Sequence, residues 1–282
     1  MEIHLANEHA YHLIPPVSVG IARDRVEQKK MNLAGGMLGT LFSRSKPEEL
    51  QLVTVESRLE PFWLVEASAR IFYDRSSTYT IPSTGPDVRS VTLLGQSLPV
   101  PAPSKGVPSL QLPVVEHCMQ EFHTHQTLDG TSGAKADFGK HTNAARNEIV
   151  DLNNFAPESM SVVPPQIRAS VVARQATAEV VKPIKNAQAI QEEQVDITTL
   201  DLYFRPIYSF EYEWLSKKKK VVIEYDPVSD DMRTGGRKFS DQFKGIITRD
   251  LLFDVTADAF GTLVPGGSIA VKLVKAVVDR KR

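Results

Sequence analysis

Apolar and polar positions change from a helical to a strand period twice along the chain. Residues 17–43 and 166–189 place apolar side chains at helical spacing among Arg, Lys, Glu and Gln, which predicts a helix in each segment. Residues 50–57 and 195–204 then alternate apolar with polar side chains, as strands with one buried face do. We therefore expect a helix followed by a strand in both halves of the chain.

Two more strands are expected after the first strand of each half. Turn-forming residues at 82–87 and 226–230 mark the end of the last expected strand in each half. The predicted second and third strands cover residues 62–73 and 78–81 in the first half, and residues 207–214 and 220–225 in the second. Each half would then be a helix packed on an antiparallel meander.

The two halves also share a short motif. In each, a proline stands two residues before an aromatic residue and five before a glutamate: Pro61, Trp63 and Glu66, then Pro206, Tyr208 and Glu211. A pair of prolines precedes the predicted helix in both halves. The same order at nearly the same spacing favours a tandem duplication, although proline–aromatic pairs are also common at strand starts.

These patterns predict an α+β protein made of two tandem related helix-plus-antiparallel-meander modules with a C-terminal helical hairpin. Five prolines between residues 98 and 113, and a segment rich in small polar residues at 126–161, indicate a connector between the modules. The expected boundaries are 1–97 for the first module, 98–161 for the connector, 162–237 for the second module and 238–282 for the C-terminal segment.

The C-terminal segment is the most apolar part of the chain. Residues 251–260 are amphipathic at helical spacing, and a second apolar helix is predicted at 268–278 after a Pro-Gly-Gly turn. Such a hairpin can pack on the sheet, join a partner chain or lie on a membrane surface. Asp254 and Asp258 argue against the membrane, so packing within the protein or an oligomer is favoured.

Composition restricts the classes of function. The chain has 282 residues, of which 24% are charged, and its formal net charge is −1, so bulk nucleic-acid binding is not expected. Its single cysteine, Cys118, excludes an intramolecular disulfide framework and suggests a reducing compartment. The N-terminus shows no secretory signal and no uncharged run is long enough for a membrane span, so a soluble cytoplasmic protein is expected.

The connector holds the candidate residues for metal chemistry. Four of the seven histidines lie there, near the cysteine, and the candidate zinc ligands are His117, Cys118, His123, His125 and His141. His123 and His125 would share one face of a strand. Their spacing matches no structural zinc motif, and a polar loop that happens to be rich in histidine is the alternative interpretation.

Motifs that would indicate catalysis are absent from the sequence. It contains no nucleophile elbow, no phosphate-binding loop, no dinucleotide fingerprint and no H-E-x-x-H. Glu66 and Glu211 recur at equivalent places, but a recurring glutamate on an alternating strand is more typical of a solvated face. An enzyme is therefore not favoured.

Aromatic and basic residues offer a candidate protein-binding surface. Alternation puts Phe210, Tyr212 and Trp214 on one face of a strand, and four lysines at 217–220 follow at an expected hairpin turn. The candidate surface comprises Trp63, Tyr208, Tyr212, Trp214, Lys217 and Lys218. Burial of the aromatic rings in the core is the alternative for at least half of them.

The segment from Phe210 to Met232, with the residues VVIEYD before its turn, resembles the closing hairpin of PepSY-type modules, which are small extracytoplasmic α+β units. The resemblance is confined to this hairpin, and the usual glycine after the aspartate is missing. No function is carried over from it.

The sequence therefore supports three hypotheses from different classes. The first is a non-catalytic binding or scaffold protein whose partner is protein, either a second copy or another chain. The second is a metal-binding protein or metal-dependent enzyme that uses the central His and Cys residues. The third is a membrane-surface or oligomerising protein that acts through residues 251–282.

Overall fold

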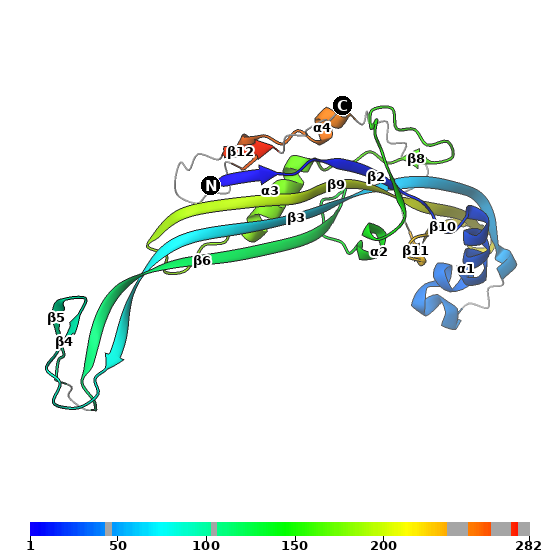
Figure 1. Ribbon diagram of the computed structural model, residues 1–282. Helices are drawn as coiled ribbons and strands as arrows, with labels where there is room; N and C mark the ends of the chain where they lie inside the picture. The colour runs from blue at the N-terminus through cyan, green and yellow to red at the C-terminus, as the bar shows by residue number, and fades with distance from the viewer. Residues whose placement is uncertain (43–46, 103–105, 236–247, 261–271, 276–282) are drawn as a thin grey trace.

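Three long strands form the spine of the molecule. In the computed structural model these are β3 (Leu50–Pro82), β6 (Ser109–Asp129) and β9 (Ala189–Trp214), and β3 pairs antiparallel with both of the others (Figure 1). The structure describes residues 1–42, 47–102, 106–235, 248–260 and 272–275.

Seven shorter strands complete a mixed ten-stranded sheet. They are β1 (Glu2–Leu5), β2 (His9–Leu13), β7 (Arg146–Glu148), β8 (Ser161–Val162), β10 (Lys219–Asp226), β11 (Asp231–Thr234) and β12 (Lys272–Lys275). A separate two-stranded sheet consists of β4 (Ser90–Leu93) and β5 (Gln96–Pro99).

Two helices of more than one turn pack against the large sheet, α1 (Val19–Phe42) and α3 (Ala169–Val180). The remaining helical segments are α2 (Gly139–Thr142), α4 (Arg249–Leu252) and the 3-10 turns Pro47–Glu49, Leu215–Lys217 and Ala257–Phe260. Within the described ranges, no helix combines the length and the apolar character that crossing a membrane requires.

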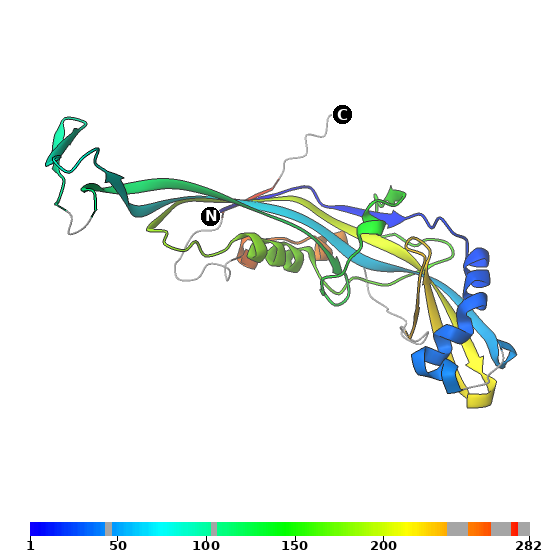
Figure 2. The same ribbon diagram turned by 90° about the horizontal axis from the view of Figure 1, so that it is seen from below.

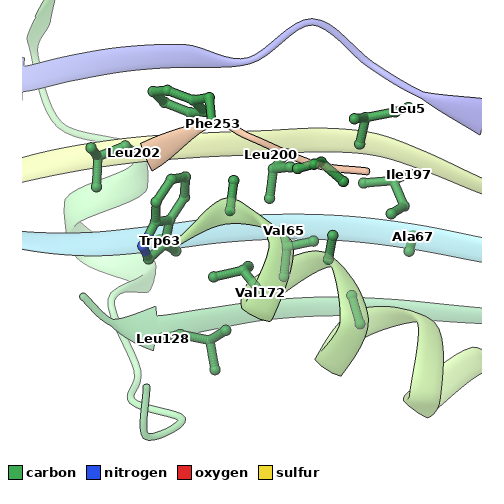
Figure 3. Close-up of a cluster of buried hydrophobic side chains, with 14 of the residues drawn as sticks. Leu5, Trp63, Val65, Ala67, Leu128, Val172, Ile197, Leu200, Leu202 and Phe253 are labelled. Carbon is green, nitrogen blue, oxygen red and sulfur yellow. The ribbon is translucent and has the colours of Figure 1, made fainter. Parts of the chain in front are cut away.

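The main core lies between α3 and one face of the sheet. Alternation along β3 sends Trp63, Val65 and Ala67 to this face, where all three are buried. Val172 of α3 is fully buried in the same cluster, and Figure 3 shows it facing these β3 side chains. Trp63 Nε1 donates a hydrogen bond to the carbonyl of Ile167 at 3.0 Å, so the indole ring is both buried and satisfied.

A second core lies under α1 at the other end of the sheet, where Figure 2 shows α1 beside β10 and the end of β9. Ala22 and Val26 of α1 are fully buried in it. The Tyr208 hydroxyl donates to the carbonyl of Val17 at 3.0 Å, and the Tyr212 hydroxyl donates to Glu27 at 2.8 Å. The helix thus closes this end of the sheet by both apolar packing and hydrogen bonds.

The prediction of two separate α+β modules is wrong. The chain is 50% strand and 19% helix, and most strands belong to one mixed sheet. The segments expected as three strands in the first half form the single strand β3, and its partner is β9 of the second half: Pro61 pairs with Phe204 and Leu59 with Pro206. Local alternation cannot distinguish a meander from one long strand, because the partner is far away in the sequence.

The two halves are also interleaved. The short strand before the first helix, β2, pairs in parallel with β9, and the short strand before the second helix, β8, pairs in parallel with β3. Each short strand therefore completes the long strand of the other half. Neither half encloses a core of its own.

The predicted C-terminal helical hairpin is wrong as well. Among its described residues, Arg249–Leu252 and Ala257–Phe260 form short helical turns, and Lys272–Lys275 is the strand β12, which pairs in parallel with β1. The rest of the predicted second helix, 268–271 and 276–278, lies outside the described residues. Leu252, Phe253 and Phe260 are buried in the main core, which makes packing within the protein the role of this apolar segment.

The predicted connector contains the third long strand. Residues 109–129 form β6, which pairs with β3 over its whole length without a shift of register. The later part of the connector contains the short strand β7 at residues 146–148.

The turn after β6 provides a test of this packing. A Cβ atom added at Gly130 would lie 2.8 Å from both the Cβ and the carbonyl oxygen of Pro61. We expect Gly130→Ala to lower the free energy of unfolding by about 2 kcal/mol, because the backbones must separate. Gly85→Ala is the matched control, since nothing lies within 4 Å of its added Cβ. Urea unfolding of both variants checks the expectation, and equal stabilities would contradict it.

Candidate functional site

A cavity of about 240 Å³ opens between the β10–β11 hairpin, β9 and the loop that carries α2. Most of its wall is charged, which is unusual for a site so close to a core. The lining residues are Asp137, Phe138, His141, Arg205, Ile207, Glu224, Asp226, Ser229, Asp231, Met232 and Arg233.

A buried ionic network lies behind this wall. Arg205 on β9 stands directly opposite Glu60 on β3, and its Nη2 donates to Glu60 Oε2 at 2.7 Å. Arg58 donates to Glu60 Oε1 at 2.7 Å and also bonds Glu224 on β10. Arg233 on β11 donates to the other oxygen of Glu224 at 2.5 Å. The network therefore ties four neighbouring strands together on one face of the sheet.

Asp226 extends the network to the loop that carries α2. Arg205 Nη1 and His141 Nε2 both lie 2.7 Å from Asp226 Oδ2, and the backbone N–H groups of Val228 and Ser229 donate to Oδ1. His141 is buried against the rings of Phe62 and Phe138. The contact between His141 and Asp226 therefore fixes the loop to the end of β10.

Neighbouring basic side chains lower the pKa of two buried carboxylates of the network, Glu60 and Asp226. Burial alone would raise the pKa of Glu60, but the guanidinium groups of Arg205 and Arg58 outweigh it and hold the pKa below its usual value. Burial opposes ionisation of Asp226 too, and the hydrogen bond and charge of His141, with Arg205, lower its pKa. Both carboxylates therefore stabilise the fold above their unfolded pKa and lose that contribution as the pH falls through the folded value.

The geometry gives this cluster a structural role. Each carboxylate oxygen of Glu60, Glu224 and Asp226 already has a partner. Two buried nitrogens of the wall, His141 Nδ1 and Arg205 Nε, have no hydrogen-bond partner in the described residues. The wall carries four carboxylates against two guanidinium groups, so it shows no excess of positive charge that would attract an anionic substrate.

The second candidate site is a projecting β-arm, which we define as residues 75–82 of β3, residues 109–116 of β6 and the β4–β5 hairpin. The pairing of β3 with β9 ends at Asp74, and beyond it β6 is the one strand of the described chain that pairs with β3. Figure 1 shows the β-arm leaving the body, with β4 and β5 at its far end. At about 3.3 Å per residue, the two-stranded part spans roughly 25 Å.

Several apolar side chains of the β-arm are exposed to solvent. Tyr79, Ile81 and Val115 are each about half exposed. A two-stranded ribbon is only marginally stable in water, so its apolar side chains are available for contact with another surface.

The tip of the β-arm ends in an unusual turn. Leu94 and Gly95 join β4 to β5, and both have positive φ angles, 50° and 81°. Such two-residue turns favour Asn-Gly, because a leucine in the left-handed region loses about 1 kcal/mol or more. Leu94 is nevertheless 97% exposed, so its side chain gains no burial within the chain that would offset this strain.

The candidate zinc ligands are brought together only in part. His117, His123 and His125 lie on one face of β6, and Cys118 faces the other way. His117 contacts Asp74 at 2.7 Å and His125 contacts Glu66 at 2.9 Å.

His141 is separated from the other candidate ligands, since it belongs to the ionic network. In the part of the chain that the structure describes, no group of three or more His, Cys, Asp or Glu side chains could hold a metal ion. The zinc hypothesis stays a prediction, which elemental analysis of the purified chain tests.

The aromatic members of the candidate binding surface are buried, which corrects the expectation that they face a partner. Trp63, Tyr208, Tyr212 and Trp214 are at most 2% exposed, because they form the two cores under α3 and α1.

The basic members of that surface do lie at a hairpin turn, as expected. Lys217 and Lys218 are exposed in the turn between β9 and β10. The Lys217 ammonium lies 3.6 Å from the centre of the Trp214 ring. This lysine therefore covers the buried aromatic cluster as well as facing solvent.

Comparisons of the chain with family models, with curated proteins and with solved structures find no match.

Sequence reasoning missed the ionic network and the β-arm for different reasons. Arg58, Glu60 and Arg205 interrupt apolar strands beside the shared prolines, and that interruption was a usable signal for buried charge. Leu94-Gly95 was harder to find, because leucine is not a residue that marks a tight turn.

The ionic network predicts a large penalty for removing one member. Arg58→Met leaves Glu224 and Glu60 short of a buried partner, so we expect the free energy of unfolding to fall by about 3 to 5 kcal/mol. Lys135→Met is the control, because its ion pair with Glu179 is exposed and contributes less than about 1 kcal/mol. Urea unfolding measures both, and similar losses would show that the network is not a stabilising clamp.

Asp201, a buried carboxylate outside the ionic network, predicts a distinct pH dependence. Burial raises the pKa of Asp201 on β9 to about 6. Since the folded pKa exceeds the unfolded value, its stabilising contribution is complete below pH 4 and is lost as the pH rises through 6. We expect Asp201→Asn to be more stable than the wild type by about 2 kcal/mol at pH 7.5, with little difference at pH 4.

Urea unfolding at the two pH values tests this expectation. Glu213→Gln, an exposed carboxylate on the same strand, is the control and should change stability little at either pH. A difference between wild type and Asp201→Asn that does not depend on pH would contradict the assignment.

Proposed function

We propose that this protein is a non-catalytic binding protein that engages a protein partner through the tip of its β-arm. The observation that carries the proposal is Leu94, an apolar side chain that is 97% exposed in a strained turn at the end of the β-arm. Strained backbone persists where function requires it, and nothing inside the chain gains from this side chain.

The rest of the β-arm supports the same role. Val91 and Leu93 on β4 are also exposed, so Leu94 belongs to an apolar patch at the tip and does not stand alone. The body of the protein is held rigidly by two cores and the ionic network, which suits a scaffold that presents a projecting element.

The test is a variant that relieves the strain of the turn and at the same time removes the apolar side chain proposed to contact the partner. Leu94→Asn places asparagine before Gly95, which is the preferred pair for this turn, so the thermal midpoint should stay the same or rise. Partner binding should fall at least about tenfold, because an apolar anchor is lost.

Affinity purification of the tagged full chain from its native host measures this loss. Val150→Asn is the matched control, because Val150 is an exposed apolar residue on the body, and it should retain the same proteins as the wild type. The proposal fails if Leu94→Asn retains the same proteins in the same amounts, or if none is retained by the wild type.

A further inference from the structure

The outer edge of β6 is a long, unprotected strand edge. In the described part of the chain β6 pairs only with β3, and residues 126–129 are approached by the loop at 134–136, which leaves the edge from 109 to 125 free. The pairing with β3 has no shift of register along it. β6 contains no Lys or Arg, and Pro113 is its only proline. Natural edge strands usually carry such residues or bulges to prevent pairing with another chain.

Other edges of the sheet carry these protective features. β11 has four residues and includes Arg233, and β12 has four residues and includes Lys272 and Lys275. The lack of protection is therefore a feature of β6 and not of the sheet in general.

The solvent-facing side of β6 has a symmetric arrangement of side chains about Met119. Met119 pairs with Phe72 of β3, and these two apolar side chains are 52% and 39% exposed. Two residues before Met119, His117 contacts Asp74 at 2.7 Å. Two residues after it, Glu121 accepts a hydrogen bond from Arg70 at 2.8 Å.

We propose that a second copy of this chain pairs antiparallel with β6, with the twofold axis passing through Met119. In this register residues 113–125 of the two copies overlap. The central row of side chains becomes Phe72, Met119, the partner's Met119 and the partner's Phe72, which is a continuous apolar stripe.

The neighbouring rows bring polar side chains of the two copies together. His117 comes to lie opposite the partner's Glu121, so each row reads Asp74, His117, the partner's Glu121 and the partner's Arg70. Like charges directly across an antiparallel pair destabilise it, and no two like charges face each other in the overlap. A surface that is complementary to itself under a twofold rotation is the signature of an isologous dimer.

Other registers lose this complementarity. An axis through His117 would set two histidines against each other and place Glu121 opposite the partner's Pro113. An axis through Cys118 would place Met119 opposite the partner's His117. This inference is independent of the proposed tip function, because the overlap excludes the β4–β5 hairpin and leaves both tips free.

Sedimentation velocity of the full chain tests the dimer. We expect a concentration-dependent dimer at micromolar concentrations. Met119→Lys sets two ammonium groups against each other on the axis, so it should weaken the dimer on the order of 100-fold while the thermal midpoint of the monomer changes little. Gln111→Lys, on the same strand outside the overlap, should leave the dimer intact. A monomeric wild type, or a dimer that Met119→Lys does not weaken, overturns the proposal.

Disulfide trapping reads the register directly. In a Cys118→Ser background, mild oxidation should link two copies of Met119→Cys, because this position alone meets itself. His117→Cys and Glu121→Cys should each remain unlinked, whereas a mixture of the two should form a linked heterodimer. Self-linking at 117 or 121, or failure of both the Met119→Cys pair and the mixture, overturns the register.

Discussion

The antiparallel pairing of β3 with β9 is the constraint on which the rest of the structure depends. It joins the two halves of the chain, and it sets the Glu60–Arg205 pair directly across the ladder. Because side chains alternate along both strands, one face receives the aromatic cores under α1 and α3, and the opposite face receives the ionic network. A slip of one residue would send the charges into the apolar cores, so the register is strongly determined.

The ionic network fixes the relative positions of strands and contributes little net stability compared with apolar packing. Buried ion pairs repay their desolvation only when their hydrogen bonds are complete, and here the carboxylate oxygens are all bonded. Their geometry fixes β10, β11 and the α2 loop relative to β3. His141, which the sequence offered as a metal ligand, acts within this network as the link to the loop.

The β-arm and the free edge of β6 follow from a difference in length. β3 continues past the last residue that β9 can pair with, so the sheet narrows to two strands and apolar side chains stay exposed. A rigid body with one projecting ribbon separates two tasks, since the tip can contact one surface while the edge of β6 pairs with another. Both proposals use exposed features that the cores of the protein do not require.

Local sequence patterns were sufficient for several elements. The helices α1 and α3, a strand over residues 195–204, the burial alternative for the aromatic residues and the hairpin turn at the lysines are all present, although β9 is buried on both faces from Leu200 to Tyr212. These features depend on neighbours within a few positions, where periodicity and turn chemistry act.

Which strand pairs with which was decided only in the tertiary structure. Pro61 and Pro206 look like strand starts in the sequence, yet both lie inside long strands, close to each other across the ladder. Residues 114–129 fall within the predicted connector, yet they belong to β6, because β3 supplies their partners from more than thirty residues away. Hydrogen bonds of a sheet join distant residues, so a single sequence specifies the strands and their faces, and only the folded chain specifies their order and the edge that remains open.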